Sequence, residues 1–331
     1  MKELALMDWL LNSYYGNEVC IVTHGGKFHA DDVYGTAMLN LAAKFVMLIA
    51  TTTNENYNRE DLFEKAFELA SKSPIKVFRI NQKNFDSDCE KIRNENQNIY
   101  SITFDVGNGR YDHHNDQLSE PWYHDVEFDG EEDLKRCAGA RIWKELMEMD
   151  PYCFGLSEKY AKRFDNEFWK VISKGDCYGP QKYPNELSRI IAGFNSKSIY
   201  DESSQMPAFK LSVQTAMNII YSLISSLLRQ QKDEQDAIKA LSNSIFDGRV
   251  VVSDKYVSAN EYMKMNDNKV QFVVFKTDLG TWNVVSTTSE RYKIANTYVT
   301  DVNCSFVHAS KFMAVFDIKE DAIECARKSI V

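Results

Sequence analysis

Imidazole and carboxylate side chains gather in one short segment near the N-terminus. Residues 24–32 read His-Gly-Gly-Lys-Phe-His-Ala-Asp-Asp, which places His24, His29, Asp31 and Asp32 within nine residues. Imidazole nitrogens and carboxylate oxygens, without thiolate, suit Mn²⁺, Fe²⁺ or Zn²⁺ at a hydrolytic site. The segment therefore indicates a metal-binding site.

Three further segments carry the same side-chain types. They contain Asp105 at the end of an apolar run, the triplet Asp-His-His at 112–114, and Asp176 where a helical pattern gives way to a loop. The four segments together supply enough ligands for two metal ions that share a carboxylate. Two ions about 3.5–4 Å apart can activate a hydroxide and stabilise both oxygens of an in-line displacement at phosphorus.

Each of these residues also has a plainer interpretation. Asp31 and Asp32 could simply place negative charge at the start of a helix, where the helix dipole favours it. Asp105 could be a turn residue before Gly107. Four of the six histidines nevertheless lie in these segments, and this coincidence favours a shared site over separate structural roles.

With these motifs the chain resembles the DHH phosphoesterase superfamily. The resemblance lies in residues 23–32, in the Phe-Asp-Val-Gly of 104–107 and in the Tyr-Asp-His-His of 111–114. The spacing from Gly107 to His114 is similar to that of the MYG-type branch, which is often labelled metal-dependent protein hydrolase and includes a 3′–5′ exoribonuclease. Residues 305–312 are similar to the late phosphate-binding segment of that branch.

The resemblance implies six metal ligands: His24, His29, Asp31, Asp105, His113 and Asp176. His24 and His29 would bind one ion and Asp31 the other, while Asp105 would bridge both. His113 and Asp176 would bind the second ion. The resemblance also implies an α/β fold of the DHH phosphoesterase type.

Further roles follow from the resemblance and from charge. Asp112 would fix an imidazole, His114 would face the substrate phosphate, and His308 would close over the terminal phosphate of the substrate. The resemblance thus implies three catalytic residues: Asp105, Asp112 and His114. Three cations near the motifs could meet phosphate oxygens or could equally be solvated charges: Lys27, Arg110 and Arg189.

The elements that must position these residues alternate between strands and helices. Apolar runs predict strands at 18–23, 45–49, 76–80 and 100–106, and three- to four-residue spacing predicts helices at 31–45 and 62–70. This alternation is typical of an α/β fold with a mostly parallel sheet and flanking helices. His24 and Asp105 follow strands, at the sheet edge where active sites of such folds lie.

The second half of the chain has a different texture. Helices are expected at 137–149, 158–174 and 185–194, followed by a polar linker at 194–207 and a long helix to about residue 245. Short strands at 249–252, 270–275, 282–286 and 304–307 precede a last helix at 317–329. We therefore expect a metal-binding catalytic domain at 1–200. Residues 201–331 should form a long connecting helix and a smaller, substrate-binding α+β domain.

Composition narrows the function. The chain has 331 residues and a formal net charge of −9, which argues against a long nucleic-acid partner. Its seven cysteines form no C-x-x-C pair, which favours a reducing, cytoplasmic location. The sequence contains no uninterrupted run of 18 apolar residues, so it predicts no membrane span. An oligomer is compatible with the sequence but is not predicted by it.

The sequence thus predicts a cytoplasmic, metal-dependent phosphoesterase with two divalent ions, Mn²⁺ ahead of Fe²⁺, Zn²⁺ or Mg²⁺. The favoured substrate is a short RNA or oligonucleotide degraded in the 3′–5′ direction. One alternative substrate is a small phosphoanhydride or cyclic dinucleotide. A second alternative is a catalytically silent metal- or nucleotide-binding protein, because the residues around Asp176 and His308 depart from the usual pattern of the branch.

Overall fold

The chain forms two compact units in a computed structural model, Met1–Leu228 and Arg229–Val331. The structure describes residues 1–52, 58–114, 122–123, 134–150, 152–265, 269–297 and 303–331. Each unit has an apolar core of its own. The two units are therefore described separately.

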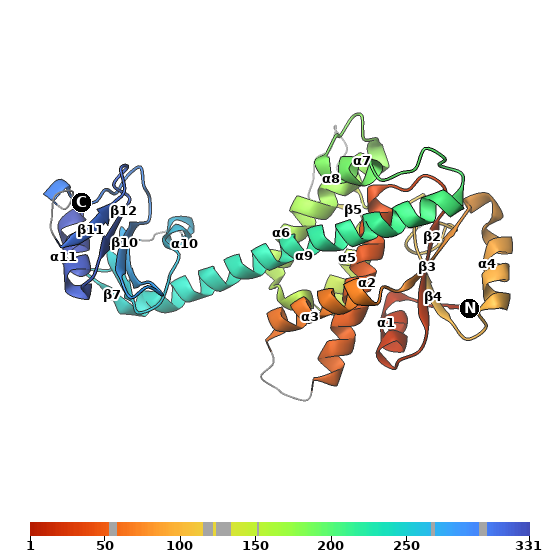
Figure 1. The fold of residues 1–331 in the computed structure, drawn as a ribbon, viewed down its shortest axis with the longest axis horizontal. Helices are drawn as coiled ribbons and strands as arrows, with labels where there is room; N and C mark the ends of the chain where they lie inside the picture. The colour runs from red at the N-terminus through yellow and green to blue at the C-terminus, as the bar shows by residue number, and fades with distance from the viewer. Residues whose placement is uncertain (53–57, 115–121, 124–133, 151, 266–268, 298–302) are drawn as a thin grey trace. The chain divides into compact units, whose positions relative to one another are not determined.

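A four-stranded parallel sheet lies within the first unit, in the order β1-β4-β2-β3. Its strands are β1 (Lys2–Glu3), β2 (Val19–His24), β3 (Lys76–Ile80) and β4 (Tyr100–Thr103). Ile21 packs into the main core, whereas its neighbour Val22 packs with residues of α4 (Phe85–Glu95). Helix α4 covers one face of the sheet, and α1 (Leu6–Tyr14) and α2 (Ala30–Thr51) cover the other (Figure 1). The predicted α/β class with a parallel sheet is confirmed.

Helix α2 is the central element of this unit. It packs between α1, α3 (Arg59–Lys72) and α5 (Ala138–Met149), so that most of its residues are buried. The strand predicted at 45–49 is wrong, because α2 continues through these residues. A short apolar run cannot be told from a buried helical segment by periodicity alone.

Among the residues that the structure describes, two helices are long and apolar enough, by length and composition alone, to cross a membrane: Ala30–Thr51 and Glu202–Asn243. In the first, 67% of the most apolar window is buried against the chain itself. This burial is what a core helix of the unit requires.

A nearly continuous helical segment carries Asp176. It consists of α6 (Glu158–Phe164), a π-helical turn (Asp165–Trp169) and α7 (Lys170–Tyr178). Gly179 ends the segment with a φ of 98°, a conformation that glycine adopts without strain. Helix α8 (Glu186–Ala192) follows. The remaining short elements of the unit are β5 (Trp122–Tyr123), β6 (Leu134–Lys135) and the 3₁₀ turns Gln82–Asn84 and Cys153–Gly155.

The long helix α9 (Glu202–Ala240) begins in the first unit and ends in the second. The division between the units falls at Leu228 and Arg229, inside α9. The reason is packing: Phe209, Met217 and Ile220 of α9 belong to the core of the first unit.

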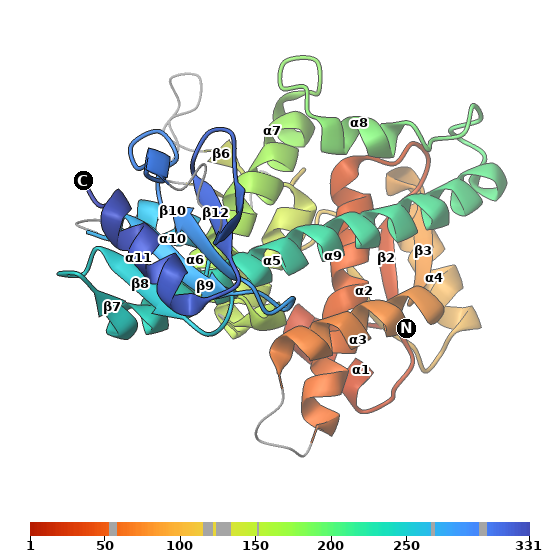
Figure 2. The ribbon, with the colours of Figure 1, turned by 60° about the vertical axis from the view of Figure 1, so that its left-hand side comes forward.

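The second unit is built on a six-stranded mixed sheet, in the order β11-β12-β10-β9-β8-β7. Only β8 and β9 pair in parallel. Helix α11 (Lys319–Ser329) packs on one face (Figure 2), and α10 (Ala259–Lys264) with the end of α9 packs on the other. The strands are β7 (Ser244–Ile245), β8 (Val250–Ser253), β9 (Phe272–Lys276), β10 (Trp282–Ser286), β11 (Cys304–Val307) and β12 (Met313–Phe316), with a 3₁₀ turn at Leu241–Asn243 before β7. The sequence prediction lacked β7 and β12.

Candidate metal centre

The connection from β2 to α2 carries the first histidines and carboxylates. His24 is the last residue of β2, and His29 immediately precedes α2. The backbone N–H of His29 donates to Asp32 Oδ1 at 3.0 Å. That bond turns Asp32 Oδ2 toward His24, whose Nε2 lies 2.9 Å away. Asp32 therefore joins the site, although it is not among the six ligands that the resemblance implies.

Asp105 lies between two imidazoles. It follows β4 with a φ of 56°, in the left-handed region that aspartate tolerates better than most residues. Its backbone N–H donates to the Tyr111 carbonyl at 3.1 Å. The carboxylate then reaches His24 Nε2 at 3.2 Å through Oδ2 and His113 Nδ1 at 3.2 Å through Oδ1. This central position is the one that the resemblance implies for a bridging ligand.

His113 connects Asp105 to the carboxylates of two helices. Its Nδ1 lies 3.5 Å from Asp31 Oδ2, near the start of α2, and its Nε2 lies 3.1 Å from Asp176 Oδ2, in the last turn of α7. His29 groups with Asp31 and Asp176, with ligand atoms within 4.8 Å of one another, whereas His24 groups in the same way with Asp32 and Asp105. The structure thus brings all six expected ligands together but divides the two first histidines between two clusters.

Buried donor atoms without hydrogen-bond partners mark the same place. They are His24 Nε2, His113 Nδ1, both carboxylate oxygens of Asp31, Asp32 Oδ2, Asp105 Oδ1 and Asp176 Oδ2. Several lie within ion-pair distance of one another, but none has a partner in hydrogen-bond geometry. Because buried polar atoms in proteins are almost always paired, such a concentration needs an explanation. A cation bound among them would satisfy these atoms, so the residues fit a metal ion.

The electrostatics of the cluster indicate the same need for positive charge. Burial and the charge of Asp105 raise the pKa of Asp31 to about 7, and burial with the charge of Asp31 raises that of Asp176. Burial alone would lower the pKa of His24, but the Asp32 and Asp105 carboxylates raise it well above its usual range. Four buried carboxylates in contact with two imidazoles leave an excess of negative charge that a divalent ion would offset.

Asp112 and His114 form a pair beside the cluster. His114 Nδ1 lies 2.9 Å from Asp112 Oδ1, and the same oxygen accepts the backbone N–H of His114 at 3.0 Å. The other oxygen of Asp112 accepts the Asn108 N–H. The side chain of His114 is 63% exposed, and its hydrogen bond to Asp112 raises its pKa. Asp112 therefore orients an imidazole that faces solvent.

A cavity of about 410 Å³ opens beside the centre. Its lining includes His29, His113, His114 and Asp176, together with residues of α8 and of the loop before it. Lys27 and Arg189 also lie on its wall, as expected for cations that could meet phosphate, although Arg189 pairs with Glu186 at 3.1 Å.

The two remaining predicted residues lie elsewhere. Arg110 is absent from the lining of this cavity, because its guanidinium pairs with Glu145 at 3.0 Å. His308 belongs to the second unit, where its Nδ1 accepts the Ser310 N–H at 3.2 Å and its ring lies against Phe312. Its role in closing over a substrate stays a prediction.

The loop between His24 and His29 is held from a distant part of the chain. Asn195 binds both backbone groups of Phe28: its Oδ1 accepts the N–H at 3.0 Å and its Nδ2 donates to the carbonyl at 2.9 Å. Glu202, the first residue of α9, accepts the Gly26 N–H. The first metal-binding segment therefore depends on contacts with residues 195–202.

Arg79 of β3 completes this support. Its Nη2 donates to the Gly26 carbonyl at 2.8 Å, and its Nη1 pairs with Glu202 at 3.1 Å. The guanidinium is fully buried and lies over the rings of Phe28 and Phe209, which compensate in part for its lost hydration. Nothing in the sequence pattern around Arg79 predicts this role.

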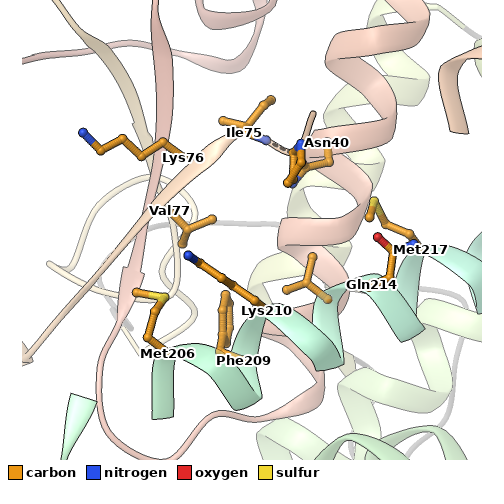
Figure 3. Close-up of a pocket in the computed structure, with 11 residues that line it drawn as sticks. Asn40, Ile75, Lys76, Val77, Met206, Phe209, Lys210, Gln214 and Met217 are labelled. Atoms are coloured by element: carbon orange, nitrogen blue, oxygen red, sulfur yellow. Dashed lines mark hydrogen bonds between the residues drawn. The ribbon is translucent and has the colours of Figure 1, made fainter. Parts of the chain in front are cut away.

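A second cavity, of about 350 Å³, lies along β3 and α9. Figure 3 shows its mostly apolar lining, with Met206 and Phe209 facing Val77 and the amino group of Lys210 beside them. Among the lining residues, the N–H of Ile75 donates to Asn40 Oδ1 at 2.7 Å. Its lining holds no carboxylate or imidazole, so this cavity offers none of the donors of the metal centre.

Comparisons with known proteins leave the family open. No family model matches the chain, and no curated protein matches it. Among solved structures it is similar to an uncharacterized protein from Helicobacter pylori G27, at 12% identity over 95% of this chain and 98% of that one, with a TM-score of 0.25. A similarity this distant supports no conclusion about the fold or the function of this chain.

Proposed function

We propose that the first unit is a metal-dependent phosphoesterase with a two-ion centre. The observation that carries the proposal is the concentration of unpartnered, buried imidazole and carboxylate donors at one edge of the parallel sheet. One ion would be held by His24, Asp32 and Asp105, and a second by Asp31, His113 and Asp176 with His29. Divalent ions at such a site supply charge stabilisation at phosphorus and lower the pKa of bound water. The resemblance to DHH phosphoesterases implies six of these seven residues as ligands, but it places His24 and His29 on the same ion and does not include Asp32.

The surrounding residues would bind and orient the substrate. Asp112 holds the Nδ1 side of His114, which leaves the other ring nitrogen of this exposed imidazole to meet a phosphate or to donate a proton. Lys27 and Arg189 on the cavity wall would pair with phosphate oxygens. A cavity of about 410 Å³ suits one small group at the end of a chain. Together with the 3′–5′ exoribonuclease activity that the resemblance implies, this leads us to propose a short RNA or oligonucleotide, degraded from its 3′ end, as the substrate class.

The test is hydrolysis by the purified full chain after exchange into Mn²⁺. A 5′-labelled short RNA, a cyclic dinucleotide and pyrophosphate would be compared, with bound metal counted by elemental analysis. Asp105→Asn removes the central carboxylate charge and should lower metal-dependent hydrolysis by at least about a hundredfold. Asp86→Asn, at an exposed position of α4, is the matched control and should retain full activity.

The outcomes separate the substrate classes. A ladder of products that shortens from the 3′ end supports the exonuclease. Cleavage of only the cyclic dinucleotide or pyrophosphate would instead show that the substrate is a small molecule. Full hydrolysis by the Asp105→Asn protein would contradict the site assignment. Two bound ions without hydrolysis of any substrate would favour a silent metal-binding protein.

A further inference from the structure

The last turn of α7 presents a thiol beside the metal centre. Cys177 follows Asp176 directly, and both precede the glycine that ends the helix. The Cys177 Sγ, a ring nitrogen of His113 and a carboxylate oxygen of Asp176 all lie within 4.8 Å of one another. Ligands on a tetrahedral Zn²⁺ with bonds of 2.0–2.3 Å lie about 3.3–3.8 Å apart. Small side-chain adjustments would therefore bring the three atoms onto one ion.

An unpartnered buried oxygen points to a ligand at this position. The Asp176 side chain is only 9% exposed, and its Oδ2 has no hydrogen-bond partner although it lies 3.1 Å from His113 Nε2. Both oxygens of Asp31, which groups with Asp176, are also buried and unpartnered. This observation is independent of the cysteine and argues for a cation beside it.

The two sides of the centre differ in their donors. The cluster of His24, Asp32 and Asp105 contains only nitrogen and oxygen, a donor set that can hold Mn²⁺ as well as Zn²⁺ or Fe²⁺. The cluster of His113, Asp176 and Cys177 adds sulfur. Thiolate selects Zn²⁺ and other softer ions over Mn²⁺ and Mg²⁺.

We propose that Cys177 is a thiolate ligand of the ion held by His113 and Asp176, and that this position prefers Zn²⁺, Fe²⁺ or Co²⁺ over Mn²⁺. The inference rests on the proposed metal centre and refines it, since the two positions then take different ions. The other use of Cys177 is as a small, half-buried packing residue, which would leave metal preference unchanged.

Cobalt spectroscopy of the full chain distinguishes these uses. The protein is stripped of metal with a chelator and titrated with Co²⁺ under reducing, oxygen-free conditions. A thiolate ligand produces an intense sulfur-to-cobalt charge-transfer band in the near ultraviolet, which nitrogen and oxygen ligands do not produce. The band should appear in the wild type, be absent from Cys177→Ser and persist in Cys304→Ser. Cys304 is the matched control, because it is also partly exposed and lies in the second unit.

Two further measurements accompany the spectra. In competition with a chelating dye, Cys177→Ser should bind Zn²⁺ about 10–100-fold more weakly, while its Mn²⁺ affinity should change less than about threefold. In the wild type, Zn²⁺ should slow alkylation of Cys177 by iodoacetamide, read by mass spectrometry. This last readout needs no variant and holds even where Cys177→Ser fails to fold.

The outcomes separate this inference from the proposed function. Co²⁺ binding without a charge-transfer band, or a band that survives in Cys177→Ser, overturns the thiolate ligand and leaves the metal centre intact. A chain that binds neither Co²⁺ nor Mn²⁺ overturns both.

Discussion

At Asp31 and Asp176, the fold without metal favours the protonated carboxyl group, whereas metal binding requires the carboxylate. Their carboxyl groups are buried near two further carboxylates, and both burial and the neighbouring negative charges raise their pKa values. A bound divalent ion would reverse that preference, because a metal ligand must be deprotonated. The same side chains thus resist ionisation without metal and require it with metal.

This opposition predicts a pH dependence. A carboxyl whose pKa is raised in the folded state binds more protons folded than unfolded, so stability falls as pH rises from about 4 toward 7. The raised pKa of His24 acts in the same direction above its ordinary value of 6.5, whereas burial lowers the pKa of His29 and so opposes the trend below that value. We expect the melting temperature of the chelated protein to fall between pH 5 and pH 8, by roughly 2–4 °C for each kcal/mol lost.

Differential scanning fluorimetry with and without Mn²⁺ measures this effect. The rise in melting temperature on adding Mn²⁺ should be larger at pH 8 than at pH 5.5. Asp31→Asn, which cannot ionise, should flatten the pH dependence of the chelated protein. A Mn²⁺ effect of the same size at every pH would contradict the prediction.

Residue types predicted the clustering of the site but not its internal arrangement. The six expected ligands come together, because two of the segments end strands of the same parallel sheet. Asp32 was missed because neighbours on a helix point about 100° apart, and the sequence does not say which one faces the centre. His29 groups with Asp176 through the placement of α7, a contact between residues far apart in the chain.

At the scale of the elements, distant contacts hold the loop at residues 25–28. Asn195 binds both backbone groups of Phe28, next to His29. We expect Asn195→Ala to weaken Mn²⁺ binding by about tenfold, because the loop loses its fixed position. The free energy of unfolding should fall by about 1–3 kcal/mol, because two buried backbone groups lose their partner.

The decisive readout is Mn²⁺ affinity measured by electron paramagnetic resonance of the free ion. Asn96→Ala is the control, because Asn96 also makes two side-chain hydrogen bonds, to Ile92 and Lys76, away from the centre. It should affect stability but not affinity. Equal losses of Mn²⁺ affinity in both variants would mean that the effect is general destabilisation.

Most individual helices and strands could be predicted from the sequence. The continuation of one element into the next and the contacts between distant elements could not. Runs of β-branched residues predict β2 and β4, the strands that precede the centre at His24 and Asp105. The spacing of apolar residues predicts α3, α5 and α11. The continuation of α2 through residues 45–49 was missed because burial on all sides removes the amphipathic signal. The support from Arg79 and Glu202 was out of reach, since it joins residues 123 positions apart.

At the scale of the whole molecule, two separate cores predict two unfolding transitions. The donors of the proposed centre all lie in the first unit, so a ligand should stabilise that unit alone. At 100 times its dissociation constant, Mn²⁺ adds about 2.7 kcal/mol, which corresponds to roughly 5–10 °C for a unit of this size.

Differential scanning calorimetry of the full chain tests this expectation. Mn²⁺ should move one of two transitions and leave the other in place, and the shift should vanish in Asp105→Asn. A single transition, or two that move together, would show that the units unfold as one.

The π-helical turn at Asp165–Trp169 leaves the chain one residue longer than regular helical turns would need. Such a turn absorbs an inserted residue without rotating the helices on either side. A shorter chain that lacks the exposed Asn166 could follow the same path in regular turns and still present Asp176 to His113. Deletion of a residue within the regular turns of α7 is different. It would rotate Asp176 by about 100° around the helix axis, away from its partners. The π-helical turn is therefore a place where the length of the segment can change. It lies directly before α7, whose rotation about its own axis must keep Asp176 facing the metal centre.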